Sequence, residues 1–286
     1  MIQNQPPDWW KHAVFYQIYP RSFYDSNNDG IGDLNGVIEK LDYLNDGQGG
    51  GLGIDAIWFS PIFKSPQRDF GYDTSDYCDI DPGYGTLADY DRLVEECHRR
   101  GIRIVLDLVL NHSSDLHPWF QESKQDRTNP KQDWYVWVDP KEDGSVPNNW
   151  LSLFGGKAWT FNEARGQYYM HSFLKEQPDL NWYNPEVRQE LAKVVRFWMN
   201  RGTDGFRLDT VNFFAYDTKL RDNPQRDPSE PILEKGQANN PYFHQNTIYS
   251  KDRPENLEFI HFLRELFDEI PGTTSIGEMG SNFGLE

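Results

Sequence analysis

Residues 184–209 read NPEVRQELAKVVRFWMNRGTDGFRLD, and this stretch decides the fold class. Asn184 suits a helix N-cap and Pro185 the first helical position, after which apolar residues recur at helical spacing. Gly202 ends the predicted helix, and residues 205–208 form a short apolar run typical of a buried strand. A helix that leads into a buried strand is the repeating unit of an α/β protein with a parallel sheet.

The same alternation runs along the rest of the chain. A capping box of Thr86 and Asp89 opens a second helical pattern, and Pro254 precedes a third. The sequence predicts five strands, at residues 14–19, 56–59, 102–108, 205–208 and 273–276. Strands that alternate with helices in this way favour successive βα units.

Residues 112–177 interrupt this alternation, because they are rich in Trp, Asn, Pro, Gly and charge and lack a sustained helical pattern. They predict a small domain inserted after the third strand, and residues 217–252 predict a long loop after the fourth. We therefore divide the chain into a first sheet-and-helix segment, an inserted domain and a second sheet-and-helix segment, at 1–111, 112–181 and 182–286.

The charge balance excludes two classes of partner. The 28 Lys and Arg residues against 45 Asp and Glu residues give a net charge of −17, which repels nucleic acid and anionic membrane surfaces. No apolar run predicts a membrane span, and the first residues lack the pattern of a secretory signal. Two cysteines, Cys78 and Cys97, form neither a disulfide framework nor a metal motif. We expect a cytoplasmic protein without an organic cofactor.

Three carboxylates, Asp107, Asp209 and Glu278, stand at or just beyond the ends of predicted strands. The ends of parallel strands converge on one face, so these acids could meet in space. Glycoside hydrolysis needs two such groups, a nucleophile and an acid/base. Arg207 precedes Asp209 by two positions on the same strand, so it would point to the same side and keep that carboxylate ionised. The simpler alternative is that each acid caps the following helix.

Five motifs carry a resemblance to a known family. The segments DLVLNH, GFRLD and GE at 107–112, 205–209 and 277–278 resemble, in order, the first three conserved regions of the α-amylase family of retaining glycosidases. AIWFSP at 56–61 resembles its second-strand region, and QPDLN at 177–181 resembles the end of the inserted domain in the oligo-1,6-glucosidase and α-glucosidase branch. The resemblance implies a (β/α)8 TIM barrel, of which this chain supplies about the first five units.

The resemblance also implies site residues. Asp209 would be the nucleophile, Glu278 the general acid/base, and Arg207 would position Asp209. Thr210 favours short α-1,4-linked substrates such as maltose, because Val at this position accompanies α-1,6 cleavage in the branch. An aromatic ring beside a charged acceptor suits a pyranose, although Tyr72 on its own would be read as a packed loop aromatic. The substrate-binding residues implied are Asp69, Tyr72, His112, Phe173, Gln177 and Thr210.

Residues 25–33 read DSNNDGIGD, with oxygen ligands at alternate positions and a turn glycine, as in a calcium loop. Gly36 stands where an EF-hand has its glutamate, so the loop is no EF-hand. The resemblance implies a structural Ca²⁺ or Mg²⁺, and the alternative is a polar turn with Asx hydrogen bonds. The implied ligands are Asp25, Asn27, Asp29, the Ile31 carbonyl and Asp33.

The family's barrel has eight strands and is followed by a C-terminal β-domain. Strands six to eight, the family's third carboxylate and the Arg that grips the sugar bound by Asp69 have no counterpart here. We expect the remainder of the barrel and the β-domain to belong to the rest of a longer enzyme. The isolated 286 residues are expected to be inactive.

The expected function is an exo-acting α-glucosidase that cleaves maltose, sucrose-type substrates or short α-linked gluco-oligosaccharides from the non-reducing end, with retention. A transglucosylase or sucrose isomerase of the same family would share all these residues and stays an alternative. A non-catalytic barrel relative predicts a membrane span and lost acids. A carbohydrate-binding scaffold has no need of Arg207 beside Asp209.

Overall fold

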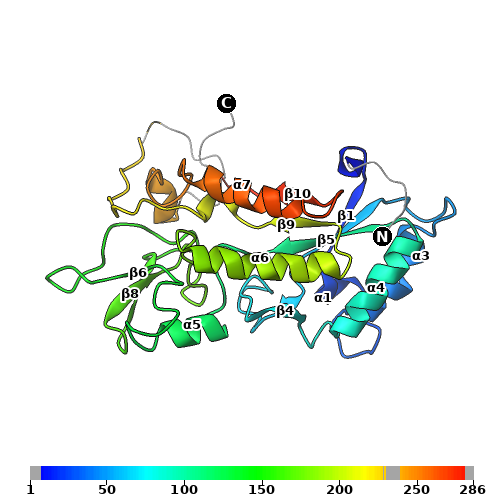
Figure 1. Ribbon diagram of the computed structural model, residues 1–286, viewed down its shortest axis with the longest axis horizontal. Coiled ribbons are helices and arrows are strands. Elements are labelled where there is room, and N and C mark those ends of the chain that lie inside the picture. The colour runs from blue at the N-terminus through cyan, green and yellow to red at the C-terminus, as the bar shows by residue number, and fades with distance from the viewer. Residues whose placement is uncertain (1–7, 228, 230–238, 281–286) are drawn as a thin grey trace. The chain divides into compact units, whose positions relative to one another are not determined.

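The computed structural model describes residues 8–227, 229 and 239–280, which form two compact units (Figure 1). The first unit lies within Met1–Val109, Glu190–Asp209 and Leu263–Gly277. The second lies within Leu110–Gln189, Thr210–Phe262 and Glu278–Glu286, so it takes in more of the chain than the predicted insertion at 112–181.

A five-stranded parallel sheet forms the centre of the first unit, in the order β1-β2-β5-β9-β10. All five predicted strands are confirmed to within one residue at each end. Their bounds are Phe15–Ile18 for β1, Ala56–Phe59 for β2, Arg103–Leu108 for β5, Gly205–Leu208 for β9 and Thr274–Gly277 for β10. The antiparallel pair β3 and β4, at Phe63–Lys64 and Asp76–Ile80, follows β2.

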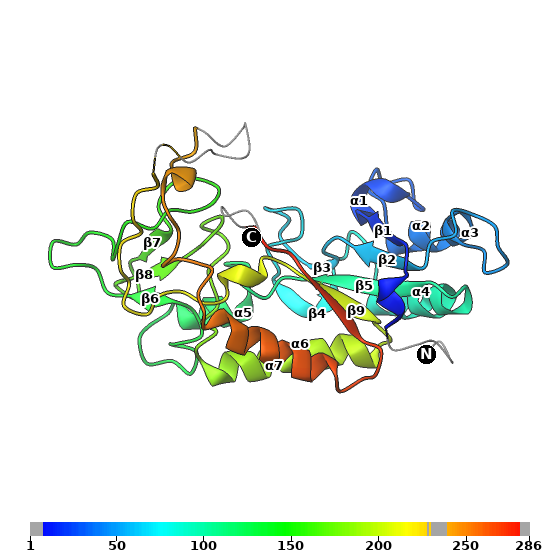
Figure 2. The same cartoon turned by 90° about the horizontal axis from the view of Figure 1, so that it is seen from above.

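Helices connect the strands of this sheet. Helix α4, at Leu87–Arg99, begins at the predicted capping box of Thr86 and Asp89 and packs against β5 (Figure 2). The predicted helix after Asn184 is confirmed as α6 at Pro185–Asn200, and the third as α7 at Asn256–Phe267. The short helices that follow β1 are α1, α2 and α3, at Pro20–Phe23, Leu34–Glu39 and Leu41–Leu44.

The second unit has a small antiparallel sheet in the order β6-β8-β7. These strands are Trp137–Val138, Gln167–Met170 and Trp159–Asn162, and the short helix α5 at Pro118–Ser123 precedes them. Buried aromatic and aliphatic side chains fill the space beside this sheet, namely Val136, Trp150, Ala158, Trp159 and Met170. An inserted segment without a long helix is therefore packed mainly through its aromatic residues.

At some glycines another backbone lies too close for a side chain, and Gly36 and Gly205 are two of them. A Cβ atom on Gly36, in α2, would lie 2.0 Å from the carbonyl oxygen of Tyr24. A Cβ atom on Gly205 would lie 2.8 Å from the carbonyl oxygen of Thr274, where β9 and β10 pair. Position 36, where an EF-hand that began at Asp25 would have its glutamate, therefore has no room for a side chain.

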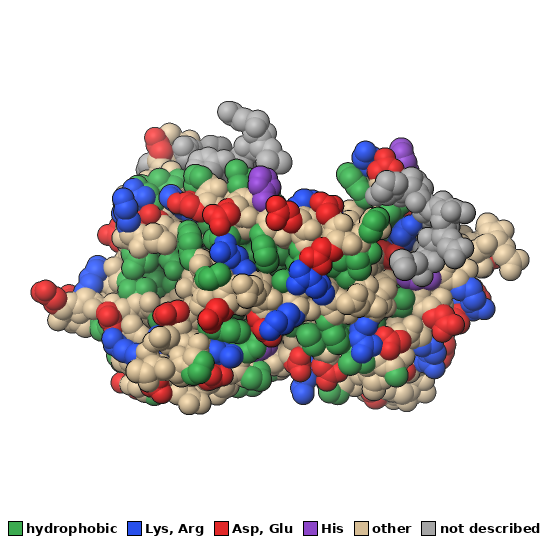
Figure 3. All heavy atoms as spheres, viewed as in Figure 1, with side chains coloured by type: hydrophobic (Ala, Val, Ile, Leu, Met, Phe, Trp, Pro, Cys, Tyr) green, Lys and Arg blue, Asp and Glu red, His purple; other side chains and the backbone are tan. Residues whose placement is uncertain are grey.

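Acidic and basic side chains are interspersed on the face seen in Figure 3. Among the described helices, none combines the length and apolar character needed to cross a bilayer. Cys97 is a buried free cysteine, as its place on the apolar face of α4 predicts.

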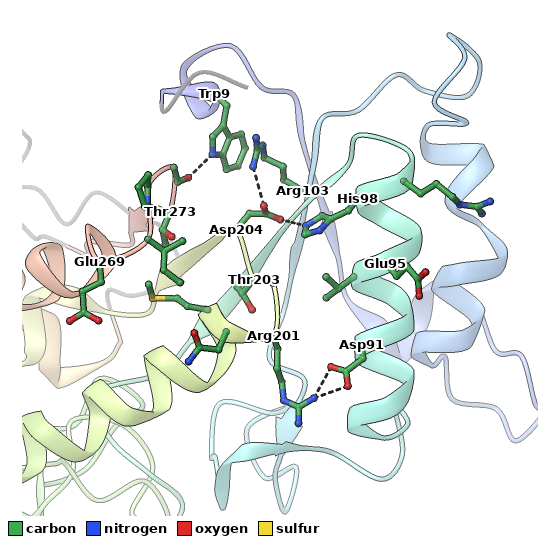
Figure 4. Close-up of a pocket in the computed structure, with 18 residues that line it drawn as sticks. Trp9, Asp91, Glu95, His98, Arg103, Arg201, Thr203, Asp204, Glu269 and Thr273 are labelled. Carbon is green, nitrogen blue, oxygen red and sulfur yellow. Dashed lines mark hydrogen bonds and ion pairs between the residues drawn. The ribbon is translucent and has the colours of Figure 1, made fainter. Parts of the chain in front are cut away.

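A pocket of about 1160 Å³ lies at the N-terminal ends of β5, β9 and β10 (Figure 4). Asp204 forms its polar centre, with Oδ2 at 2.8 Å from His98 Nε2 and Oδ1 at 3.0 Å from Arg103 Nη1. Trp9 Nε1 donates a hydrogen bond to the carbonyl of Gly272 at 2.8 Å across one edge of the pocket. Asp107 and Asp209 lie at the opposite, C-terminal ends of their strands. This pocket is therefore separate from the candidate catalytic acids.

Candidate functional site

Arg207 joins two carboxylates at the C-terminal ends of β5 and β9. Asp107 and Arg207 are register partners on these neighbouring strands. Arg207 Nη1 donates to both oxygens of Asp107, at 2.8 and 2.9 Å, and to Asp209 Oδ1 at 2.7 Å. All three residues are buried, at 7%, 2% and 5% exposure for Arg207, Asp107 and Asp209. The predicted contact between Arg207 and Asp209 is present, and Asp107 is its second partner.

Burial and charge oppose each other in this trio. Burial disfavours the charge of Arg207, but the Asp107 and Asp209 carboxylates outweigh it and raise the pKa of the guanidinium. Burial raises the pKa of Asp107 to about 6, although Arg207 and hydrogen bonds from neighbouring side chains act to lower it. One cation therefore holds two carboxylates in a poorly solvated site, the setting in which electrostatic interactions are strong.

Two aromatic side chains complete the surroundings of Arg207. The Tyr72 hydroxyl and Trp58 Nε1 donate to Asp107 Oδ2, at 3.2 and 3.3 Å. The guanidinium carbon of Arg207 lies 5.3 Å from the ring centroid of Trp58 and 5.8 Å from that of Tyr72. Sequence reasoning missed Trp58, although it belongs to the AIWFSP segment and is the least buried residue of β2.

Asp69 lies in a loop whose backbone is strained. The buried Asp73 carboxylate holds this loop, since it accepts from the Ser65 hydroxyl at 2.8 Å and from the Asp69 N–H at 3.0 Å. Gln67 and Phe70 have φ values of 61° and 50°, in the left-handed region that non-glycine residues rarely adopt. Strain of this kind persists where surrounding contacts enforce it, and it is frequent at functional sites.

Glu278 follows β10 directly and is bound by the backbone that follows Asp209. Thr210 N–H donates to Glu278 Oε2 at 3.4 Å, and Val211 N–H donates to the Glu278 carbonyl at 3.1 Å. Thr210 has φ 45° and ψ 47°, a costly conformation for a β-branched residue. This turn directs the N–H groups of Thr210 and Val211 toward Glu278.

The two predicted catalytic acids occupy equivalent places on neighbouring strands. Leu208 of β9 is the register partner of Gly277 of β10. Asp209 and Glu278 each follow their strand by one residue. Asp209 belongs to the first compact unit and Glu278 to the second.

Three of the predicted substrate-binding residues come together in the second unit. Gln177 Nε2 lies 3.1 Å from His112 Nε2, and the His112 and Phe173 rings are 5.1 Å apart between centroids. His112 and Gln177 are almost fully buried, and Phe173 is 5% exposed. His112 also forms an antiparallel bridge with Asp179, which brings QPDLN beside the end of DLVLNH.

Asp179 is a buried carboxyl group that sequence reasoning missed, although it is the central residue of QPDLN. It accepts from the Ser172 N–H and hydroxyl and from Asn111 Nδ2, at 3.0, 2.5 and 3.2 Å. Burial raises the pKa of Asp179 to about 7, and these hydrogen bonds only partly oppose the shift. The group therefore titrates near neutral pH.

Asp179→Asn is expected to flatten the pH dependence of stability. Because the native pKa of Asp179 is raised, the protonated carboxyl group stabilises the fold fully below about pH 4. This stabilisation, roughly 4 kcal/mol of the free energy of unfolding, is lost as the pH rises through 7. The amide of the variant is neutral at every pH, so its free energy of unfolding lacks this loss. The difference in stability between variant and parent should therefore favour the variant more at pH 8 than at pH 4. Urea unfolding at both pH values measures this difference, with the exposed-carboxylate variant Asp91→Asn as control. Parallel pH profiles for Asp179→Asn and the parent would refute the expectation.

The loop at 25–33 is held by hydrogen bonds from its own backbone. Gly30 and Asn28 N–H groups donate to the Asp25 carboxylate at 2.8 and 2.7 Å, and these bonds lower the pKa of Asp25. Asp33 caps α2 through Gly36 N–H at 2.7 Å. Among the described side chains, no three from Asp, Glu, His and Cys are gathered as metal ligands would be. The predicted ligand set also includes the Asn27 side chain and the Ile31 carbonyl, and cation binding by this loop stays a prediction from the resemblance.

Calcium is expected to raise the melting temperature of the protein through this loop. A calcium concentration 100-fold above Kd would add about 2.7 kcal/mol, a shift of several degrees. Asp25→Ala should abolish the shift. Thermal unfolding with calcium and with a chelator measures it, and equal melting temperatures in the parent under both conditions would argue against a metal.

Comparison with known proteins agrees with this arrangement. The α-amylase catalytic domain matches residues 17–284. A probable α-glucosidase of Rhizobium meliloti is 56% identical over 98% of this chain and 50% of its own length. An oligo-1,6-glucosidase of Parageobacillus thermoglucosidasius is 54% identical over 75% of this chain and 37% of its own. The solved structure of the α-glucosyl transfer enzyme XgtA is 56% identical, with a TM-score of 0.92 over 98% of this chain and 51% of that one.

The chain thus spans about half the length, or less, of these relatives. The match extends through all five predicted motifs, and the parallel strands β1, β2, β5, β9 and β10 follow the order expected for the first part of a (β/α)8 barrel. Asp107, Arg207 and Asp209 meet at the strand ends where such barrels place their chemistry. The protein belongs to the α-amylase family of glycoside hydrolases, and these 286 residues correspond to part of the family's catalytic domain.

Proposed function

We propose that this chain carries the nucleophile and the acid/base of a retaining, exo-acting α-glucosidase. The observation that supports this most strongly is the single guanidinium nitrogen of Arg207 bound to both Asp209 and Asp107. This contact orients the Asp209 carboxylate and favours its ionised form, as a nucleophile requires. The register of β9 and β10 gives Glu278 the equivalent position on the next strand.

In the proposed reaction the Asp209 carboxylate attacks the anomeric carbon of the non-reducing-end glucose. The bond from that carbon to the glycosidic oxygen breaks as Glu278 donates its proton to the departing oxygen. Water then attacks the glucosyl ester, Glu278 takes a proton from it, and Asp209 is released. Two displacements at one carbon return the original anomeric configuration.

The remaining roles concern the sugar. In this proposal Tyr72 presents a ring to the pyranose, and its hydroxyl is held by Asp107. Asp69 accepts from hydroxyls at the non-reducing end, and His112, supported by Gln177 and Phe173, binds hydroxyls of the cleaved residue. The protein of which this chain forms part would supply the rest of the barrel.

Thr210→Val is expected to shift preference from α-1,4 toward α-1,6 linkages. Val has the same branched shape as Thr, so the left-handed backbone at this position is strained in both, and the change replaces the hydroxyl by a methyl group. The ratio of kcat/KM for isomaltose to that for maltose should rise several-fold, on the order of 1 kcal/mol. An unchanged ratio in the variant would remove Thr210 from linkage selection.

Transfer of glucose to a sugar acceptor is the second candidate function, and one relative, XgtA, is described as an α-glucosyl transfer enzyme. Hydrolysis and transfer share the glucosyl ester and differ in what attacks it. The ratio of oligosaccharide products to free glucose, measured over rising maltose concentration, separates them.

Covalent trapping tests the proposed function. The full-length protein containing this chain would be treated with a 5-fluoro-glucosyl fluoride, which forms a slowly hydrolysed glucosyl ester on a nucleophilic carboxylate. Peptide mapping should find the label on Asp209, and proton NMR of maltose hydrolysis should show α-glucose as the first product. A label on another carboxylate, or β-glucose as first product, would reject the proposal.

A further inference from the structure

Lys251 is a buried cation in the second compact unit. Only 2% of the residue is exposed, and Nζ lies 5.0 and 5.9 Å from the ring centroids of Phe213 and Tyr242. The Asp252 carboxylate is 3.8 Å away, at the outer limit of an ion pair. Burial lowers the pKa of Lys251, with Asp252 opposing the shift. Removing an ammonium group from water costs several kcal/mol, so stability alone would favour an apolar side chain here.

The hydrogen bond from Lys251 goes to the segment that follows Glu278. Lys251 Nζ donates to the carbonyl oxygen of Gly280 at 2.5 Å, and Asn212 Nδ2 donates to the same oxygen at 3.1 Å. A charged donor makes the stronger kind of hydrogen bond. Two side chains therefore hold one carbonyl group, two residues beyond Glu278.

We call the two hydrogen bonds from Lys251 and Asn212 to the Gly280 carbonyl the clamp. Asn212 also belongs to the stretch of backbone whose N–H groups bind Glu278. Its Nδ2 also donates to Asp252 Oδ1 at 2.8 Å, and its carbonyl accepts from the Asp252 N–H at 2.9 Å. Asn212 comes immediately after Thr210 and Val211, whose N–H groups donate to Glu278. Glu278 is thus held on one side by the turn after β9 and on the other through Gly280.

We propose that Lys251 and Asn212 are positioning residues for Glu278, acting through the Gly280 carbonyl. This inference rests on the proposed function, in which Glu278 donates a proton to the departing oxygen. An acid displaced from its position slows a reaction most when the leaving group needs that proton. The clamp explains why a buried cation is kept beside this segment although the Asp252 carboxylate lies as far as 3.8 Å away.

The test compares two substrates in the full-length protein containing this chain. Maltose loses a sugar alkoxide that needs a proton, whereas α-glucosyl fluoride loses fluoride with little need of one. We expect Lys251→Met to lower kcat/KM about tenfold or more for maltose and less than about twofold for the fluoride. Asn212→Ala should likewise lower kcat/KM more for maltose than for α-glucosyl fluoride. Lys251→Arg should restore most of the maltose activity, because a guanidinium can donate to the same carbonyl.

Two controls separate the possible outcomes. Glu278→Gln shows whether Glu278 is the acid, and Leu263→Ala, at a fully buried residue of α7, shows the effect of destabilisation alone. If Glu278→Gln lowers kcat/KM much more for maltose than for the fluoride but Lys251→Met and Asn212→Ala do not, the positioning role is wrong and the proposed function stands. If Glu278→Gln affects both substrates equally, Glu278 is not the acid, and the positioning role is wrong as well. Should Lys251→Met fail to fold, Asn212→Ala decides the question.

Discussion

Asp209→Asn is expected to lower kcat/KM for maltose by roughly 10⁴-fold or more in the full-length protein containing this chain, without loss of stability. The amide has nearly the shape of the carboxylate but is a poor nucleophile. In the parent, Arg207 binds two buried carboxylates, Asp107 and Asp209. Neutralising one of them leaves a balanced pair, so the melting temperature should stay the same or rise. Steady-state kinetics and thermal unfolding of the same preparations measure both effects.

The matched control is Asp143→Asn, at an exposed loop carboxylate, which should keep activity within about twofold. Azide gives a further readout, because it can replace the missing nucleophile in Asp209→Gly and should yield β-glucosyl azide. In Glu278→Gly azide should attack the glucosyl ester and yield α-glucosyl azide. If Asp209→Asn lost activity only in proportion to a loss of stability, Asp209 would be a structural residue.

Arg207→Met should lower the free energy of unfolding by about 3–5 kcal/mol, because it removes the guanidinium group that binds the buried carboxylates of Asp107 and Asp209. The flexible apolar side chain of Met fills much of the space, so the loss of stability comes mainly from the two ion pairs that are removed. Activity should also fall, by about 10²-fold or more, since Asp209 loses the contact that orients it. Urea unfolding and kinetics at pH 7 measure the two effects.

A double variant isolates the electrostatic part of this effect. Asp107→Asn combined with Arg207→Met removes one of the two negative charges that Arg207 binds in the parent. The double variant should therefore be more stable than Arg207→Met alone. Asp107→Asn by itself should cost less, because Arg207 keeps Asp209 as partner. A double variant no more stable than Arg207→Met would show that packing, and not charge, accounts for the destabilisation.

The strands and the long helices were predictable because each is encoded in a short window of sequence. The capping box at Thr86 and Asp89, and Pro185 at the start of α6, mark helix ends through contacts within one turn. The extent of the second unit was not predictable in this way. It joins 110–189 to 210–262 and 278–286, segments brought together by packing across long sequence separations.

The candidate site divides along the same line. Arg207 beside Asp209 follows from strand periodicity, because residues two apart point to one side. The role of Asp107 as second partner of Arg207 depends on the register of β5 against β9, between residues 100 positions apart. Trp58 and Asp179 lie in recognised motifs and Lys251 lies in none, but the sequence did not predict the part that any of them plays. Each matters through its burial and its contacts with remote segments.

By itself, therefore, the sequence determined which segments become strands and that acidic residues stand at the ends of three of them, since these properties depend on near neighbours along the chain. Only the tertiary structure decided that Arg207 binds two carboxylates, that burial raises the pKa of Asp179 to about 7, and that Lys251 holds the backbone beyond Glu278. The physical reason is that burial and charge pairing depend on how distant segments pack, which no local pattern of residues specifies.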